Sequence, residues 1–318
     1  MNYLPISIII PTMNRPKSLK RTLLSIISFQ YLPNEIIIID QSSDEKIRFT
    51  NKSIITNLQS SCNLIYIYQN IPSSTKARNI GIEKSSNDII VFSDDDVDVY
   101  CNTLKSIYND FQDESVALIA GVNKNYSDSN NFLGYLSFQK SFFKRKKGHV
   151  TKAMYSRYPL QIFHGKIETE WAAGFYFAVR KTLCQKWNVY FDEALIGYAY
   201  AEDMDFTYLY YKNAKNESLK CLIDSSVIVN HLVSQEYRLK NRSTIIKQII
   251  NRRYLSYKHF DSFLCRCACI WSDFMLFCFY ILNGKKIQAF AIIHAQKLCL
   301  KYRKQLITGD NLYELYNL

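Results

Sequence analysis

The chain has 318 residues, and hydrophobic residues make up 48% of them, enough for a sizeable core. Its 40 Lys and Arg residues outnumber its 28 Asp and Glu residues, which gives a net charge of +12. No zinc-finger or RNA-recognition signature accompanies this charge, so we expect no nucleic-acid partner. The nine cysteines include no CxxC pair, and their odd number argues against a closed disulfide set.

Regular spacing of apolar segments predicts the fold class. Four strand-like runs, 25 to 29 residues apart, begin near Ile6, Glu35, Asn63 and Asp88. Each interval holds a helical pattern or a polar connection, and residues 16–29 begin with proline and place apolar residues on one face. This period is typical of βαβ units, so the sequence predicts an α/β fold with a mostly parallel sheet flanked by helices.

An acidic cluster follows the fourth predicted strand, where Asp94, Asp95 and Asp96 are consecutive. Adjacent carboxylates repel one another, and their oxygens suit a hard divalent cation such as Mg²⁺ or Mn²⁺. In open α/β sheets, ligands bind beyond the carboxyl ends of the strands. The cluster therefore predicts a metal and nucleotide site, and a solvated acidic turn is the alternative.

Polar residues follow the other predicted strands as well. Thr12, Asn14 and Arg15 lie in the turn after the first strand and can form hydrogen bonds or pair with a phosphate. Asp40 ends the second strand, where a carboxylate suits a base or a ribose, or equally caps a helix. Arg78 follows the third strand and can contact the aspartates or a phosphate.

The pattern weakens over residues 123–170, where the basic stretch Lys144–Lys147 lies. A long irregular segment inside a compact domain is usually a functional loop or lid. Order returns at residues 171–180, and residues 200–211 have a helical pattern.

The C-terminal part is basic, because residues 231–318 contain 14 Lys and Arg against 5 Asp and Glu. We expect helices there, with breaks near Asp261 and at Asn283–Gly284. Interleaved aromatic and basic residues favour an anionic membrane surface or a lipid-linked phosphate as the partner. Within residues 264–282, charges leave only nine uninterrupted apolar residues, which predicts a packed or surface-lying helix rather than a membrane span.

Five segments, taken together and in order, resemble the family 2 glycosyltransferases, which are inverting enzymes with the GT-A fold. They are Ser7–Arg15, Ile39–Asp40, Ala77–Gly81, Ser93–Asp96 and Ala201–Asp205. The resemblance implies a GT-A catalytic domain over residues 1–235, with a nucleotide-binding half to about 122 and an acceptor-binding half over about 123–235. Residues 236–318, a basic helical C-terminal region, lie outside it.

The resemblance implies a set of residues for the nucleotide-sugar donor. Pro11, Thr12, Asn14 and Arg15 match the first nucleotide-binding loop. The other matches are Asp40 at the base, Arg78 near the diphosphate, Asp94 near the ribose, Asp95 in the middle of the DxD motif, and Asp96 on the metal.

The resemblance also implies a catalytic base. Asp203 matches this base at the start of a helix, with the neighbouring Glu202 next in line; stabilisation of the helix N-terminus is the alternative role. His231 is placed like a histidine that completes the metal site, or is structural. Trp171 and Gly174 match the acceptor-binding segment, although Trp171 is equally suited to the core.

The expected function is metal-dependent, inverting transfer of a sugar from a nucleotide-diphosphate donor to a saccharide or lipid-linked acceptor in surface polysaccharide synthesis. One alternative is a non-catalytic GT-A-like scaffold or binding protein. Another is a sugar-phosphate nucleotidyltransferase, which would want a Gly-rich loop after the first strand; no glycine precedes Gly81. The N-terminus has no apparent signal peptide, so we expect a cytoplasmic enzyme, peripheral on the inner face of the cell membrane.

Overall fold

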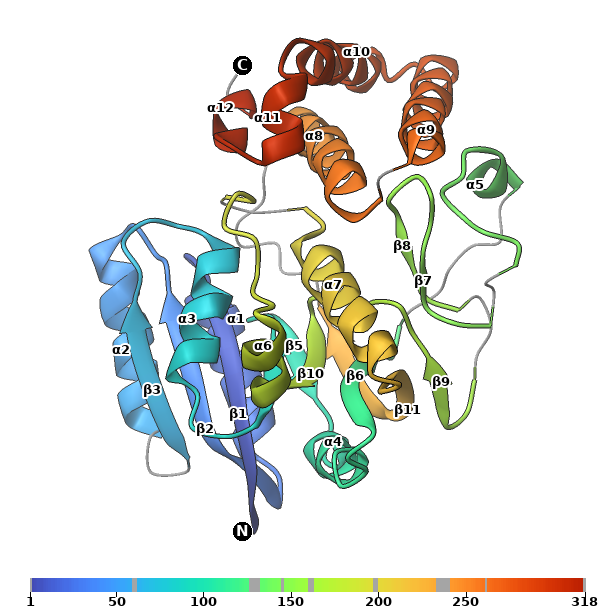
Figure 1. Ribbon diagram of the computed structural model, residues 1–318. Coiled ribbons are helices and arrows are strands. Elements are labelled where there is room, and N and C mark those ends of the chain that lie inside the picture. Colours follow the sequence, from blue (N-terminus) through green and yellow to red (C-terminus); the bar gives the residue numbers. More distant parts are fainter. Residues whose placement is uncertain are drawn as a thin grey trace.

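The computed structural model of the protein describes residues 2–58, 62–125, 132–143, 146–159, 163–196, 200–232, 241–260 and 262–316. Over these residues one mixed sheet forms the centre, in the order β3-β2-β1-β4-β10-β6-β11-β5, and β9 pairs with β11 outside this path (Figure 1). Its strands are β1 (Asn2–Thr12), β2 (Tyr31–Asp40), β3 (Asn63–Tyr68), β4 (Ile89–Ser93), β5 (Val97–Val99), β6 (Val116–Asn123), β9 (Lys166–Glu168), β10 (Tyr176–Arg180) and β11 (Lys220–His231).

The regular spacing predicted the parallel strands β1 to β4, whereas the parallel pair of β6 and β11 lies outside that spacing. β1 pairs in parallel with β2 and β4, and β2 pairs in parallel with β3. The isoleucines of β1 and β2 are buried on both sides of the sheet, which is why these strands are continuous apolar runs. β10 lies antiparallel between β4 and β6, a pairing that the repeat did not predict. The α/β fold itself is confirmed.

Helices cover both faces of the sheet. Ile8 and Ile10 of β1 pack in one core, and Ile9 packs in the other, because successive strand residues point to opposite faces. The first core is closed by α1 (Pro16–Ile27), α2 (Glu45–Leu58) and α4 (Thr103–Asp110). The second is closed by α3 (Ser74–Lys84), α6 (Lys181–Trp187) and α7 (Glu202–Asn216).

The irregular segment 123–170 contains short elements where it is described. They are α5 (Phe132–Leu136), a hairpin of β7 (His149–Val150) and β8 (Ser156–Arg157), and the sheet strand β9. Trp271 donates its indole N–H to the Leu136 carbonyl at 2.8 Å, so α5 contacts the C-terminal helices. Lys144 and Arg145 lie outside the described residues, and a lid function for this segment stays a prediction.

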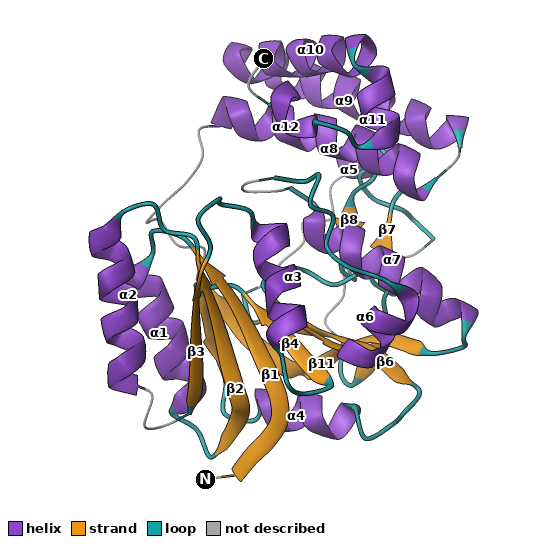
Figure 2. Cartoon of the chain, turned by 60° about the vertical axis from the view of Figure 1, so that its left-hand side comes forward, coloured by secondary structure: helices purple, strands orange, loops and turns teal. Residues whose placement is uncertain are grey.

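The C-terminal part is helical, as predicted, and its helices stack against one end of the sheet domain (Figure 2). Tyr254, Leu255 and Ala295 join the same core as α3 and α7. The expected boundary at 235 falls among residues 233–240, outside the described residues, so the domain limits stay predictions. The helices are α8 (Asn241–His259), α9 (Phe263–Leu282), α10 (Lys286–Lys301), α11 (Arg303–Thr308) and α12 (Leu312–Leu315).

Both predicted breaks lie between helices, at residues 260–262 and at Asn283–Gly284, although Asp261 itself is outside the described residues. The count of nine uninterrupted apolar residues underestimated the apolar length of α9. This helix has 20 residues and, by length and composition alone, could span a membrane. Only 28% of that span is buried. Its Asp273 is buried and pairs with Arg252 of α8 at 2.9 Å, which anchors α9 to the neighbouring helix.

Candidate active site

The acidic turn after β4 lies beside the end of β1, because the two strands are parallel neighbours. Its backbone is bonded on two sides. Asp94 N donates to the Phe175 carbonyl at 3.0 Å, just before β10. Thr22 of α1 donates to the Asp95 carbonyl at 2.8 Å and accepts from Val97 N at 3.0 Å. The turn is thus fixed by residues that the sequence reasoning did not identify.

The middle carboxylate, Asp95, points back into the fold. It accepts a hydrogen bond from Thr12 Oγ1 at 2.7 Å and one from Arg15 Nη1 at 3.1 Å. Burial raises the pKa of Asp95 to about 7, despite the opposing effect of Arg15. The predicted first nucleotide loop is therefore bonded directly to the predicted DxD motif.

The outer carboxylates approach His231 at the end of β11. One ligand atom from each of Asp94, Asp96 and His231 lies within 4.8 Å of the other two. His231 Nε2 is 3.2 Å from Asp96 Oδ1, and its ring stacks on Phe175 at a centroid distance of 5.4 Å. Burial lowers the pKa of His231, but the hydrogen bond with Asp96 and the charges of both aspartates produce a net rise.

Arg78 of α3 joins the acidic turn to the start of α7. Its guanidinium contacts Asp94 at 3.0 Å and Glu202 at 3.1 Å, and it is almost fully buried. Burial raises the pKa of Glu202 to about 7, and it raises the pKa of Asp94 as well. Each shift persists although Arg78 opposes it, which means that these acids are incompletely neutralised.

Asp203 is held by backbone donors. Gly174 N donates to Asp203 Oδ2 at 2.8 Å, and Met204 N donates to Oδ1 at 2.7 Å. Burial raises the pKa of Asp203, against the effect of these N–H groups. Thr207 secures the same turn, because its hydroxyl donates to the Asp203 carbonyl at 2.6 Å and accepts from Ala172 N at 3.0 Å.

The structure thus brings five acids to one edge of the sheet, where four of them pair with Arg15 or Arg78 and the fifth, Asp203, accepts from backbone N–H groups. We call them the carboxylate centre: Asp94, Asp95, Asp96, Glu202 and Asp203. Sequence reasoning identified each of them but assigned Asp94 to the ribose, whereas its side chain also lies among the candidate metal ligands. Their individual roles stay predictions.

Asp40 is placed at the end of β2 with both oxygens bonded inside the protein. It accepts from Ser42 N at 2.8 Å, Asn51 Nδ2 at 2.9 Å and Tyr66 OH at 2.9 Å. The helix-cap alternative is wrong, because Asp44 accepts from Lys46 N at the start of α2 instead. These contacts connect distant residues, so no local motif pointed to Asn51 or Tyr66.

The remaining predicted site residues lie near the same edge or behind it. Asn14 has a left-handed backbone, with φ of 57°, and donates its N–H to Ser42 Oγ at 2.9 Å. Pro11 lies in β1, in register with Ile39 of β2. Trp171 is buried, donates its indole N–H to the Arg157 carbonyl at 2.9 Å and packs on Tyr158. These contacts suit a core role, and its predicted part in acceptor binding stays a prediction.

Comparison with known proteins identifies a glycosyltransferase family and an individual glycosyltransferase as similar to this chain. The family described as Glycosyl transferase family 2 matches residues 7–186. The poly(ribitol-phosphate) β-N-acetylglucosaminyltransferase TarP of Staphylococcus aureus (strain N315) is 26% identical over 241 residues, which cover 75% of this chain and 67% of TarP.

Solved structures show the same fold. S. aureus TarS has a TM-score of 0.51 and 17% identity; the match covers 87% of this chain but only 42% of that TarS chain. The mannosyltransferase PcManGT of Pyrobaculum calidifontis, solved with GDP-Man and Mn²⁺, has a TM-score of 0.54 and 12% identity, covering 98% of this chain and 86% of its own. These likenesses agree with the expected GT-A architecture, and it is the family match and the relative TarP that support glycosyl transfer.

Proposed function

Since the chain belongs to glycosyl transferase family 2, and is therefore a glycosyltransferase, we propose that it transfers a sugar with inversion from a nucleotide-diphosphate donor. The acceptor is a saccharide or a lipid-linked saccharide of surface polysaccharide synthesis. The observation that carries this proposal is the convergence of Asp94, Asp96 and His231 beside the pairs of Arg78 with Asp94 and Glu202.

The donor atoms at this point fit a divalent cation. Two carboxylate oxygens and an imidazole nitrogen within 4.8 Å of one another are ligands that Mn²⁺ accepts, and carboxylates suit Mg²⁺. Asp94, Asp96 and His231 would hold the ion, which supplies positive charge beside the departing diphosphate. Raised pKa values at Asp94 and Asp95 are consistent with acids that lack sufficient positive charge without an ion.

Asp203 is proposed as the general base. It takes the proton of the acceptor hydroxyl while the acceptor oxygen bonds to the anomeric carbon, and the bond to the nucleoside diphosphate breaks on the opposite face. A raised pKa makes this carboxylate a better proton acceptor, and the N–H groups of Gly174 and Met204 fix its orientation. Glu202 is less suited, because Arg78 pairs with its side chain.

The relative TarP supports a polymer as the acceptor, since its name describes transfer to poly(ribitol-phosphate). We also propose cytoplasmic localisation with peripheral contact to the membrane. The basic C-terminal region and the exposed apolar residues of α9, Phe263, Leu264 and Phe274, support this contact. Sedimentation with anionic vesicles, compared with zwitterionic vesicles, tests it, and equal recovery with both would contradict it.

Calorimetry with UDP, GDP, dTDP and CMP, with and without Mn²⁺, tests the catalytic proposal without an acceptor. We expect Mn²⁺-dependent binding of one of the three nucleoside diphosphates, which Asp96→Ala abolishes. Asp98→Ala is a matched control, because Asp98 lies two residues away and pairs with Arg21 at 2.5 Å outside the carboxylate centre. Absence of nucleotide binding under every condition would refute the proposal.

A further inference from the structure

The first turn of α7 has one side toward the carboxylate centre and the other toward α8. Asp203 and Asp205 are two residues apart, so their side chains leave the helix about 200° apart. Asp203 bonds to Gly174, whereas Asp205 pairs with residues of α8 and is only 1% exposed. The turn that carries the proposed base therefore rests on a C-terminal helix.

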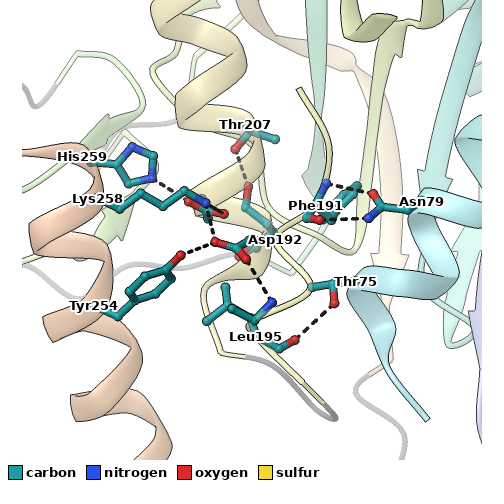
Figure 3. A network of polar contacts seen from close by, with 12 residues as sticks. Thr75, Asn79, Phe191, Asp192, Leu195, Thr207, Tyr254, Lys258 and His259 are labelled. Carbon is teal, nitrogen blue, oxygen red and sulfur yellow. Dashed lines mark hydrogen bonds and ion pairs between the residues drawn. The ribbon is translucent and has the colours of Figure 1, made fainter. Parts of the chain in front are cut away.

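Two consecutive residues at the end of α8 bind Asp205. Lys258 Nζ is 2.8 Å from Asp205 Oδ2, and His259 Nε2 is 2.7 Å from Oδ1. Figure 3 shows both side chains extending from α8 toward this turn. Because each carboxylate oxygen of Asp205 has its own partner, Lys258 and His259 together fix the rotation of the turn as well as its distance from α8.

Lys258 also binds a second carboxylate, which belongs to the segment between α6 and α7. Its Nζ lies 2.6 Å from Asp192 Oδ2, and the Tyr254 hydroxyl donates to the same oxygen (Figure 3). Burial raises the pKa of Asp192, but Lys258 and these hydrogen bonds lower it by more, so that the pKa lies below its usual value. One cation thus connects two chain segments through two carboxylates.

The segment that carries Asp192 is bonded in turn to α3. Asn79 Nδ2 donates to the Phe191 carbonyl at 2.9 Å, and Phe191 N donates to Asn79 Oδ1 at 2.8 Å. Thr75 Oγ1 donates to the Leu195 carbonyl at 3.2 Å (Figure 3). Arg78 lies between these two positions on α3, and its guanidinium is 5.4 Å from the Phe191 ring centroid. The contacts from Lys258 therefore reach both Asp203 and Arg78.

We infer that Lys258 is a positioning residue, which sets the proposed base relative to Arg78 from the C-terminal helical region. This inference rests on the proposed function. We call Asp192, Asp205, Tyr254, Lys258 and His259 the Lys258 network. Without the ammonium group, two carboxylates lose their shared cation, and the first turn of α7 separates from the segment before it. Gly174 N then no longer meets Asp203 at hydrogen-bond distance.

Hydrogen exchange tests this without any substrate. Lys258→Met is compared with Lys247→Met, a matched control, because both lysines lie on α8 and each lies over a tyrosine ring. We expect at least tenfold faster exchange in peptides of residues 171–176 and 202–210 in Lys258→Met only. Equal exchange in the two variants would overturn the inference. If Lys258→Met does not fold, Tyr254→Phe should give a smaller change in the same peptides.

Kinetics separate positioning from a general structural role. The substrate is a sugar derivative of the nucleotide that binds in the calorimetry. We expect Lys258→Met to lower kcat for hydrolysis of this donor about 100-fold, with a KM within about threefold of the native value. Lys258→Arg should recover part of the loss. Equal kcat values for Lys258→Met and Lys247→Met would contradict positioning. If the native protein cleaves no nucleotide sugar, the proposed function fails, and hydrogen exchange still decides the role of Lys258.

Discussion

Two groups of acids lie on opposite sides of the first turn of α7, and they differ in how far they are neutralised. In the Lys258 network, Asp192 and Asp205 share one lysine at 2.6 and 2.8 Å, and the pKa of Asp192 is lowered in spite of its burial. In the carboxylate centre, burial dominates instead and raises the pKa of Glu202 to about 7.

This difference separates a structural use of carboxylates from a functional one. A buried acid that is fully paired contributes to a fixed arrangement of the chain and has nothing further to bind. A cluster whose pKa values remain raised is stabilised by any added cation, which is the condition of a site that awaits a ligand. Acids two residues apart in sequence can therefore have different effects on stability.

The largest expected effect is the loss of transfer in Asp203→Asn. An amide cannot take the acceptor proton, so kcat should fall by about 10²–10⁴ while nucleotide affinity is retained. Stability should change little, because the relief of crowding among the acids offsets the loss of one of the two backbone hydrogen bonds to Asp203, since an amide has a single acceptor oxygen. Kinetics, calorimetry and thermal unfolding check the three parts. Retention of full activity would exclude Asp203 as the base and direct attention to Glu202.

Asp205→Asn should differ from Asp203→Asn in its effect on stability. It removes the charge that pairs with Lys258 inside the protein, so we expect the free energy of unfolding to fall by about 3 kcal/mol. This loss of stability is at the low end of the range for breaking a buried ion pair, because Lys258 remains paired with Asp192. Denaturant unfolding measures it. An unfolding free energy unchanged from the native protein would show that the Lys258 network adds no stability.

Gly174→Ala tests how closely the acceptor-side segment approaches the base. A Cβ at this position would lie 3.1 Å from Asp203 Cβ and 3.5 Å from Arg78 Nη2. Relief of this contact should displace Asp203 and lower kcat by about tenfold or more, with a stability cost of about 1 kcal/mol. Ala173→Gly, in the same segment, is the control that adds no atom. Equal kcat in both variants would refute the argument.

The carboxylate centre was largely predictable from the sequence, whereas the Lys258 network was not. Asp94, Asp96 and Asp203 each stand at the end or start of an element with a recognisable pattern, and parallel strands bring such ends to one edge. Asp192 and Lys258 have no such local marker. Their partners are far apart in the chain, and only the docking of α8 brings them together.

The same limit applies to the fold. Apolar runs of regular spacing predicted β1 to β4, because parallel strands buried on both faces are continuous in composition. β5 and β9 are three residues each and are defined by their pairing with β11, not by their own sequence. For Trp171 the sequence suited both an acceptor-binding role and a core role, and its hydrogen bond to the Arg157 carbonyl suits the core role.

The two groups of acids should also respond differently to pH. Native Glu202 keeps its proton up to about pH 7, whereas an unfolded glutamate releases it near 4.5, so stability should fall as the pH rises between these values. Asp192 has a lowered pKa, and its contribution should be lost only on acidification. Denaturant unfolding at several pH values without divalent cations checks this. Glu202→Gln should flatten the slope between about pH 4.5 and 7, and an unchanged slope would contradict the assignment.

The smallest expected effect concerns Ala201, the residue immediately before α7. Ala201 precedes the first turn of α7 in a left-handed conformation, with φ of 68°, which costs an L-residue about 1–2 kcal/mol. Ala201→Gly removes this strain but adds freedom to the unfolded chain, so a net gain of about 0.5 kcal/mol should remain. Ala214→Gly, inside the same helix, should instead cost about 1 kcal/mol. Opposite shifts of the denaturation midpoint would show that the start of α7 is strained, and equal losses would show that it is not.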